Sequence, residues 1–318
     1  MTGGAGFIGS HLCDKLLSSK IEKLIIIDNF SSGKTRNIEH LQQNARVKSY
    51  KLNASNYQQM FSVFKKERID IVFNLAIVPL HKSLVAPRET VARNILITTT
   101  MCELLRQKLY KTLIHCSSSE AYGTALYAPM DEEHPLNPIT PYAASKAACD
   151  HIVMSYHRTF NVDVAIVRPF NAYGPRQSEG LYAAIVPITI RRILAGKQPI
   201  IYGDGFQTRD YTFVEDIVEG IIRVYKVRLT RGKVINIASG KEIRIRELVY
   251  LIGKLMDYKG KITYTKPRRG DVRRHEGDIS LAKKLLHYLP KIDYKTGLLK
   301  TIEYEKRLIK ERWKDEKT

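Results

Sequence analysis

A short polar stretch carries the first residues whose types suit catalysis. Residues 117–123 read SSSEAYG and directly follow the apolar run Thr112–Cys116. A glutamate at the end of a buried strand is costly unless it is paired or used. Glu120 is therefore a candidate acid–base residue, with the capping of a turn as the alternative explanation.

A tyrosine and a lysine further along the chain form a second candidate pair. Tyr142 and Lys146 lie in TPYAASK (140–146), where Thr140 and Pro141 predict the start of a helix. Their spacing of four residues puts both side chains on one helix face. A buried ammonium beside a phenol stabilises phenolate, so Tyr142 could remove a hydroxyl proton near neutral pH.

A glycine-rich loop at the start of the chain suits a dinucleotide. TGGAGFIGSHL (2–12) has glycines at positions 3, 6 and 9, where the backbone and a helix N-terminus can approach a pyrophosphate. Asp28 ends an apolar strand 19 residues after Gly9, a place from which a carboxylate binds the adenosine ribose and disfavours a 2′-phosphate. We therefore predict NAD rather than NADP; the alternative is a glycine turn followed by a polar strand end.

The elements that must position these residues alternate along the first half of the chain. Strand-like runs at 23–28, 69–75, 112–116 and 162–168 alternate with helix-length stretches near 9–19, 55–67, 88–108 and 141–160. Continuous apolar strands separated by helices predict an α/β fold with a Rossmann-like, doubly wound parallel sheet. The central strand that normally precedes the glycines is missing, because the sequence begins at Met1. We interpret this as a shortened chain or a mis-assigned start.

The second half is punctuated by proline and glycine and returns to regular patterns later. We predict a strand at 234–238 and helices at 245–256, 280–287 and 297–313. The division expected is a NAD-binding domain over residues 1–170 and mainly a smaller, interwoven α/β substrate lobe over 171–318. Some segments of the second part are expected to return to the first sheet.

Composition narrows the class of protein. Four cysteines without CxxC pairing suit a reducing cytoplasm, and no metal site is predicted. No apolar run approaches the roughly 20 residues needed to span a bilayer, so we expect a cytoplasmic protein without membrane insertion. Residues 223–318 hold 27 Lys and Arg against 12 Asp and Glu. This excess favours a solvated basic surface, with attraction of an anionic substrate as the second interpretation; nucleic-acid binding is not expected, because no recognition motif accompanies the charge.

Together the motifs resemble the extended short-chain dehydrogenase/reductase family of nucleotide-sugar epimerases and dehydratases. The resemblance runs nearly end to end. It is carried by TGGAGFIGSHL (2–12), IIIDNFSSG (25–33), FNLA (73–76), SSSEAYG (117–123), PYAASK (141–146), VRPFNAYGPRQ (167–177), IYGDGFQTRDYTFVEDI (201–217) and RRGDVRRHEGDIS (268–280).

The resemblance implies roles for individual residues. Ser118 matches the serine or threonine that hydrogen-bonds the sugar 4-hydroxyl, and Tyr142 and Lys146 match the catalytic pair. Substrate contacts are implied for Ser118, Ser119, Asn171, Arg209, Arg268 and Asp271. Cofactor contacts are implied for Gly3, Gly6, Phe7, Ile8, Gly9, Asp28, Asn29, Ser32, Asn53, Ala54, Leu75, Ala76, Asn94, Tyr142 and Lys146. The partners implied are a nucleotide-diphosphate sugar and a second copy of the chain, with the helices near 88–108 and 141–160 pairing in a homodimer.

Two departures from the family pattern affect the predicted reaction. Asn53 stands where relatives often have an aspartate that meets the adenine amine, and Ser119 stands where relatives often have a second acid. Glu120 occupies the position of the base that removes the C5 proton in 4,6-dehydratases, whereas GLYAAIVP (180–187) resembles a segment of hexosamine 4-epimerases. The sequence therefore favours a 4,6-dehydratase acting on UDP-N-acetylglucosamine or a similar sugar. A UDP-hexose 4-epimerase comes second, followed by a UDP-glucuronate decarboxylase or a non-catalytic NAD-binding protein.

Overall fold

The fold is organised around one parallel sheet. The structure is a computed structural model that describes residues 1–177, 184–268 and 270–315. The strands of its first half are β1 (Leu24–Asp28), β2 (Val47–Lys51), β3 (Ile71–Asn74), β4 (Thr112–Cys116) and β5 (Asp163–Pro169). A strand from the second half, β10 (Val234–Ile237), pairs in parallel with β5. The sheet order runs β2-β1 on one side and β3-β4-β5-β10 on the other.

The first three residues of the chain join these two parts of the sheet. Thr2 forms parallel bridges to both Ile27 and Asn74. The backbone N–H of Gly3 donates to the Ile27 carbonyl at 2.8 Å, and that of Thr2 donates to the Phe73 carbonyl at 3.1 Å. The place expected for the missing central strand is thus held by residues 1–3, which lead directly into the glycine loop.

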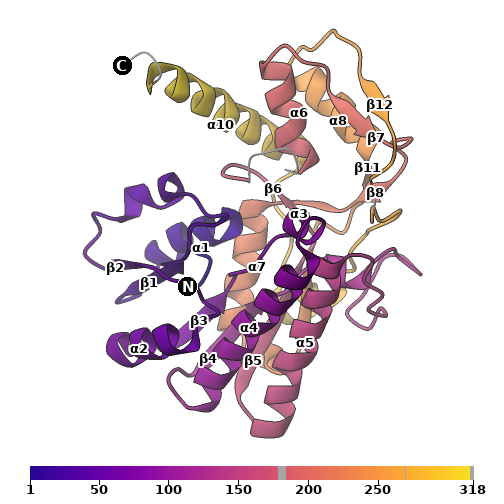
Figure 1. The fold of residues 1–318 in the computed structure, drawn as a ribbon. Helices are drawn as coiled ribbons and strands as arrows, with labels where there is room; N and C mark the ends of the chain where they lie inside the picture. Colours follow the sequence, from indigo (N-terminus) through magenta and orange to yellow (C-terminus); the bar gives the residue numbers. More distant parts are fainter. Residues whose placement is uncertain (178–183, 269, 316–318) are drawn as a thin grey trace.

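Helices cover both faces of the sheet (Figure 1). They are α1 (Phe7–Leu17), α2 (Tyr57–Glu67), α3 (Leu80–Ser83), α4 (Pro87–Arg106), α5 (Pro141–Phe160), α7 (Val214–Lys226) and α9 (Ser280–Leu286). One apolar core joins the sheet to α1, α7 and α9, and a second core joins its other face to α2, α4 and α5. The predicted doubly wound α/β fold is confirmed.

The helix that carries the tyrosine–lysine pair begins as the sequence predicts. The Thr140 hydroxyl accepts from the Ala143 N–H at 3.1 Å, and Pro141 takes the first helical position. The helix ends at Asn161, whose backbone is left-handed with a φ of 52°. Because α5 packs along α4 against β4 and β5, its first two turns lie at the carboxyl end of the sheet.

The second lobe has its own apolar core. It contains α6 (Ile185–Leu194), α8 (Ile245–Leu255) and α10 (Tyr294–Asp315), with the short strands β6 (Asn171–Tyr173), β7 (Ile200–Tyr202), β8 (Thr208–Arg209), β9 (Tyr211–Phe213), β11 (Ile243–Arg244) and β12 (Thr263–Thr265). Of the predicted epimerase-like segment 180–187, residues 180–183 lie outside the described residues. So does Arg269 of the 268–280 motif. Within the described helices, none is long and apolar enough to cross a membrane.

Candidate active site

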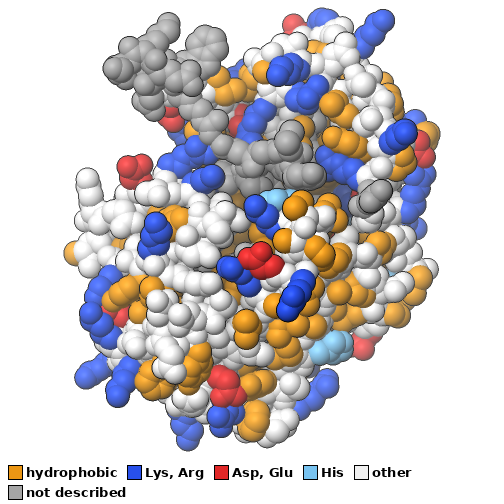
Figure 2. Space-filling view, in the orientation of Figure 1, with side chains coloured by type: hydrophobic (Ala, Val, Ile, Leu, Met, Phe, Trp, Pro, Cys, Tyr) orange, Lys and Arg blue, Asp and Glu red, His pale blue; other side chains and the backbone are white. Residues whose placement is uncertain are grey.

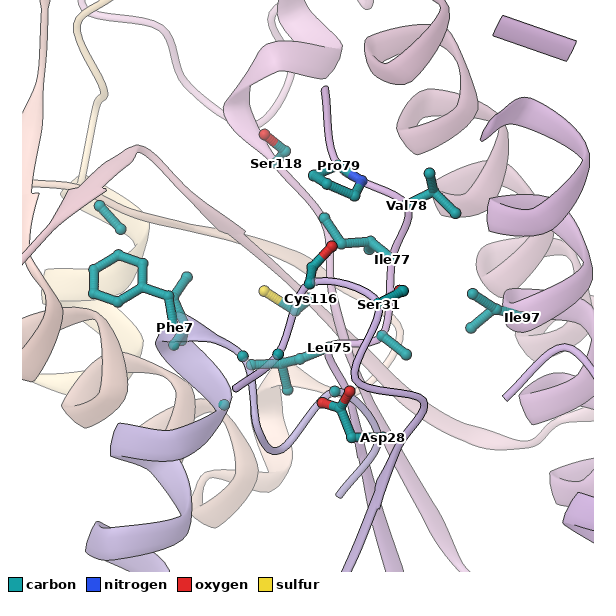
Figure 3. Close-up of a pocket in the computed structure, with 18 of the residues that line it drawn as sticks. Phe7, Asp28, Ser31, Leu75, Ile77, Val78, Pro79, Ile97, Cys116 and Ser118 are labelled. Atoms are coloured by element: carbon teal, nitrogen blue, oxygen red, sulfur yellow. The ribbon is translucent and has the colours of Figure 1, made fainter. Parts of the chain in front are cut away.

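One elongated pocket follows the carboxyl end of the sheet. Its lining contains the glycine loop at one end and the 117–120 stretch at the other. Figure 3 shows Asp28 and Ser118 toward opposite ends of this pocket, with Leu75 and Cys116 between them. A site of this length suits an extended ligand such as a dinucleotide, with a reactive group next to Ser118.

The glycine loop forms a cradle that side chains would fill. A Cβ at Gly9 would lie 2.1 Å from the Gly3 carbonyl oxygen, and one at Gly3 would lie 2.7 Å from the Ala76 nitrogen. Gly3 also has a φ of +69°, a conformation that favours glycine. The loop therefore keeps bare backbone beside the N-terminus of α1, as binding of a pyrophosphate requires.

Asp28 lies at the base of the pocket with its carboxylate held by backbone. One oxygen accepts from the Ala5 N–H at 2.9 Å, and the other accepts from the Phe30 N–H at 2.8 Å. Burial raises the pKa of Asp28, while these two hydrogen bonds lower it. Each oxygen retains a lone pair for a ribose hydroxyl, so the residues of this end fit the adenosine half of NAD.

Most of the predicted cofactor residues line this pocket, and Asn94 is the exception. The lining includes Gly3, Gly6, Phe7, Ile8, Gly9, Asp28, Asn29, Ser32, Asn53, Ala54, Leu75, Ala76, Tyr142 and Lys146. Asn94 is buried behind it, where its side chain bonds both backbone groups of Val78 and donates to the Ser145 hydroxyl at 2.9 Å. It supports Val78, which does line the pocket, and a direct contact with the dinucleotide stays a prediction.

At the other end, the tip of β4 meets the first two turns of α5. The Lys146 ammonium donates to the Cys116 carbonyl at 2.6 Å, and the Tyr142 and Ser118 hydroxyls both line the pocket there. Burial raises the pKa of Tyr142, the Glu120 carboxylate raises it further, and the bond to Ser118 lowers it. The phenol therefore stays protonated until a positive charge, such as a nicotinium ring, reaches the pocket.

Glu120 lines the same pocket as this pair, and its carboxyl group is free of hydrogen bonds to the described residues. The turn Ser119–Tyr122 is capped by Ser118, whose hydroxyl accepts from the Glu120 N–H at 3.2 Å. Among the described residues, no side chain or backbone group forms a hydrogen bond or ion pair with the Glu120 carboxyl. Burial raises its pKa, Arg209 lowers it and Asp271 raises it. The capping that was the alternative explanation for Glu120 is thus performed by Ser118.

The predicted diphosphate residues are divided between the pocket and its margin. Ser119 and Asn171 line the pocket, whereas Arg209, Arg268 and Asp271 do not. Arg209 is buried and paired with Asp271, and the Arg268 guanidinium lies 4.0 Å from the centre of the Tyr202 ring. The structure therefore groups Arg209 and Asp271 near Glu120, but it does not bring all the predicted substrate ligands into one lining.

Sequence reasoning did not find His275, which joins the two halves of the site. Its Nε2 lies 3.1 Å from the Ser119 carbonyl oxygen and its Nδ1 lies 3.5 Å from Asn171 Nδ2. Burial and the neighbouring Arg209 lower its pKa to about 3. His275 is therefore a neutral ring between the catalytic turn and β6. The sequence signal was its place in the 268–280 motif, which gives no hint of this contact.

Other residues of the lining were also missed. Lys34, Arg36, Arg93 and Arg176 add cationic side chains to the pocket. Arg176 also pairs with Asp14 on α1 at 2.7 Å. Within the described part of the chain, no group of three or more His, Cys, Asp or Glu is placed to hold a metal ion.

One pocket contains a cradle suited to pyrophosphate, a carboxylate suited to ribose and a buried tyrosine–lysine pair. This combination is typical of a dinucleotide-dependent enzyme that moves a hydride and a hydroxyl proton. The chain belongs to the GDP-mannose 4,6 dehydratase family, whose model matches residues 1–301. The resemblance found in the motifs is thereby confirmed.

Both epimerases and dehydratases are found among the relatives and solved structures that the chain resembles. The chain is 33% identical to a putative UDP-glucose 4-epimerase of Methanocaldococcus jannaschii, over 96% of this chain and 97% of the relative. Its fold matches the UDP-glucose 4-epimerase of Thermotoga maritima solved with UDP-glucose, with a TM-score of 0.91, 31% identity and coverage of 97% and 98%. It also matches DesIV, a dTDP-glucose 4,6-dehydratase of Streptomyces venezuelae solved with NAD, with a TM-score of 0.90, 26% identity and 96% coverage of each chain.

These comparisons confirm an enzyme of the nucleotide-sugar epimerase and dehydratase class. They do not support the order in which the sequence ranked the two reactions, because epimerases are at least as well represented among the relatives.

Proposed function

We propose that the protein is an NAD-dependent 4-epimerase of a UDP-hexose, such as UDP-glucose or UDP-N-acetylglucosamine. The observation that carries the proposal is the content of the pocket around Tyr142. Among its described lining residues the carboxylates are Asp28, at the adenosine end, and Glu120. Epimerisation needs only the tyrosine, its serine and its lysine, whereas dehydration also needs a base at C5 and an acid for the leaving C6 hydroxyl.

The residues present suffice for the chemistry of epimerisation. Tyr142 would take the proton of the sugar 4-hydroxyl, with Ser118 bonded to the same oxygen, and Lys146 would stabilise the phenolate. NAD, when bound, accepts the hydride from C4 and returns it. Tyr142 would then hand the proton back after the 4-keto sugar has turned over in the pocket.

Relatives with this activity support the same conclusion. The relative from Methanocaldococcus jannaschii and the Thermotoga maritima structure both bear the name UDP-glucose 4-epimerase. Cofactor selection by Asp28 and diphosphate binding by Asn171, Arg209, Arg268 and Asp271 are parts of this proposal. When the diphosphate binds, Arg209 would either leave Asp271 or contact the diphosphate while it stays paired with Asp271.

A 4,6-dehydratase remains a second candidate because of one observation. The Glu120 carboxyl lines the same pocket as Tyr142 and has no hydrogen-bond or ion-pair partner among the described residues, as a C5 base would. No second acid stands at position 119, so Glu120 would also have to protonate the leaving hydroxyl. A raised pKa suits a group that must hold a proton during part of its cycle.

One experiment separates the two reactions. The protein is incubated separately with UDP-glucose, UDP-N-acetylglucosamine, dTDP-glucose and UDP-glucuronate in deuterium oxide, and the products are analysed by NMR. An epimerase yields C4 epimers without deuterium at C5, because the C5–H bond never breaks. A dehydratase yields a 4-keto-6-deoxy sugar with deuterium at C5, and Glu120→Gln should abolish that incorporation. Release of carbon dioxide from UDP-glucuronate, with neither of these products, would contradict both proposals.

A homodimer through α4 and α5 is a further part of the proposal. Both helices pack on the same face of the sheet, and Leu96 of α4 and Phe160 of α5 are about half exposed. Two copies that pair through these helices would bury such side chains. Light scattering at micromolar concentration should give the mass of a dimer, and a monomer would contradict this interface.

A further inference from the structure

A third buried polar residue stands below the tyrosine and lysine on the same helix. Tyr142, Lys146 and Asp150 of α5 follow one another at intervals of four residues, and all three are buried. Asp150 is only 2% exposed and is not part of the pocket lining. It therefore cannot touch substrate or cofactor, and neither the family resemblance nor the proposed mechanism gives it a task.

The end of β4 contacts α5 at each of these three residues. The Ser118 hydroxyl lowers the pKa of the neighbouring Tyr142 phenol, and the Cys116 carbonyl accepts from Lys146 at 2.6 Å. The Ser117 hydroxyl donates to Asp150 Oδ2 at 2.8 Å. Three consecutive residues of the strand end thus hold three successive turns of the helix.

The same carboxylate oxygen also binds the neighbouring strand. Arg168 of β5 donates from Nε to Asp150 Oδ2 at 2.9 Å, and its Nη2 lies 2.8 Å from that oxygen. The guanidinium of Arg168 lies 4.6 Å from the centre of the Tyr122 ring. Asp150 therefore ties α5 to two adjacent strands at once, and strands buried in a sheet are the most rigid support available here.

The other carboxylate oxygen faces a neutral histidine. The Thr2 hydroxyl donates to Asn74 Oδ1 at 2.6 Å, so the Asn74 amide nitrogen is the group 3.1 Å from His115 Nδ1. His115 then carries its proton on Nε2, which lies 4.0 Å from Asp150 Oδ1. Burial and the nearby Lys146 hold the pKa of His115 well below its usual range. Asp150 Oδ2 thus accepts from Ser117 and Arg168, whereas Oδ1 has no hydrogen-bond partner among the described residues and has His115 Nε2 as a donor just beyond hydrogen-bond distance.

We propose that Asp150 is a positioning residue, which fixes the distance of Tyr142 and Lys146 from Ser118 through Ser117 and Arg168. The inference rests on the proposed function, because the pair it positions is the catalytic pair of that reaction. A displacement of about 1 Å at such a pair can cost about a hundredfold in rate. Asp150 would therefore affect the rate of oxidation at C4 and leave the binding of NAD and nucleotide sugar unchanged.

The test uses Asp150→Asn with a matched control. The amide has the same shape but brings an N–H against the donors of Ser117, Arg168 or His115. The control is Glu305→Gln, because Glu305 is also fully buried, accepts two 2.6 Å bonds from Arg191 in the second lobe and contributes neither to the pocket lining nor to the contacts of Tyr142 and Lys146. Both variants should lose stability. Only Asp150→Asn should lower kcat, by about tenfold to a hundredfold, with KM and bound NAD unchanged.

A second variant covers the case in which Asp150→Asn does not fold. Ser117→Ala keeps the Asp150–Arg168 ion pair and removes one contact only, so it should lower kcat in the same direction but less. Equal kcat values in wild type, Asp150→Asn and Glu305→Gln would overturn the proposal. So would an unchanged kcat in Ser117→Ala where the aspartate variant fails to fold.

Crystal structures of the variants make the test independent of turnover. In Asp150→Asn, or in Ser117→Ala if needed, the contacts of Lys146 with Cys116 and of Tyr142 with Ser118 should lengthen, while Glu305→Gln retains them. Unchanged contacts would overturn the positioning role. If the wild type turns over no nucleotide sugar, the proposed function fails, and the structures alone still decide whether Asp150 positions the pair.

Discussion

The two ends of the pocket are built in different ways. At the dinucleotide end, the glycine loop offers bare backbone and the Asp28 carboxylate is held by backbone N–H groups, and all of these residues lie within the first 28 of the chain. At the substrate end, side chains arrive from distant segments, and they include Glu120, Asn171, Arg209 and His275.

This difference affects what each end can do before a ligand arrives. The dinucleotide end is complete, because its shape depends on glycines that admit no side chain. At the substrate end, Arg209 is already paired with Asp271, and Tyr142 is held protonated by burial. The first end is thus a preformed cradle, whereas the second must exchange internal partners for substrate.

The basic character of the chain belongs mainly to the second part. Lys and Arg side chains are numerous around α6, α8 and β12 in the upper right of Figure 2. Several are paired on the surface, such as Arg273 with Asp204 and Arg274 with Glu242. Exposed pairs of this kind contribute little to stability, so this basic surface adds little to the stability of the fold.

The largest expected effect comes from removing the phenol that joins the two ends. Tyr142→Phe should lower kcat by about 10²–10⁴-fold, because the C4 hydroxyl loses its base. NAD should stay bound, since the glycine loop and Asp28 are untouched. The control is Tyr156→Phe on the same helix, whose hydroxyl bonds Glu103 at 2.6 Å on the far side from the pocket. Equal activity of the Tyr142 variant and wild type, in steady-state assays, would refute the assigned base.

A smaller effect is expected from the arginine at the substrate end. Arg209→Gln should raise KM for the nucleotide sugar by about tenfold to a hundredfold, the cost of losing hydrogen bonds to a charged group. Binding of NAD should not change, which would show that substrate binding and NAD binding depend on separate ends of the pocket. Arg273→Gln serves as the control, because that arginine is exposed and pairs with the exposed Asp204 at 2.9 Å. A raised kcat with unchanged KM would show that Arg209 does not hold the diphosphate.

The same contrast explains how far the sequence could predict the molecule. The strands β1, β3, β4 and β5, the start of α5 at Thr140 and the glycine loop depend on residues close together in the chain, and they were predicted. The strand β2 was missed because VKSYK is half exposed and lacks a continuous apolar run. The pairing of Arg209 with Asp271 and the contacts of His275 depend on segments far apart in sequence, which no local pattern brings together.

A more modest effect should follow from Asp28→Ser. Loss of the carboxylate removes a charge-assisted bond to the ribose and the repulsion of a 2′-phosphate, so the preference for NAD over NADP should narrow by about tenfold. The ratio of dissociation constants for the two cofactors measures this directly. The KM for the sugar should stay constant, and an unaltered cofactor ratio would contradict the role of Asp28.

The smallest effect concerns stability at low pH and the neutral histidine of the substrate end. With a folded pKa of about 3, His275 binds no proton in the native state between about pH 3 and 6.5, whereas the unfolded state does. Stability from this group is therefore complete above about pH 6.5 and is lost as the pH falls toward 3. The slope of the unfolding free energy against pH reports how many more protons the unfolded state binds than the native state. His275→Gln should lower this number by about one between pH 3 and 6.5, as measured from urea unfolding at a series of pH values. His151→Gln, at an exposed position of α5, should leave the slope unchanged. If His275→Gln shows the wild-type slope, the buried ring is protonated together with the unfolded chain and does not stand as a neutral link between Ser119 and Asn171.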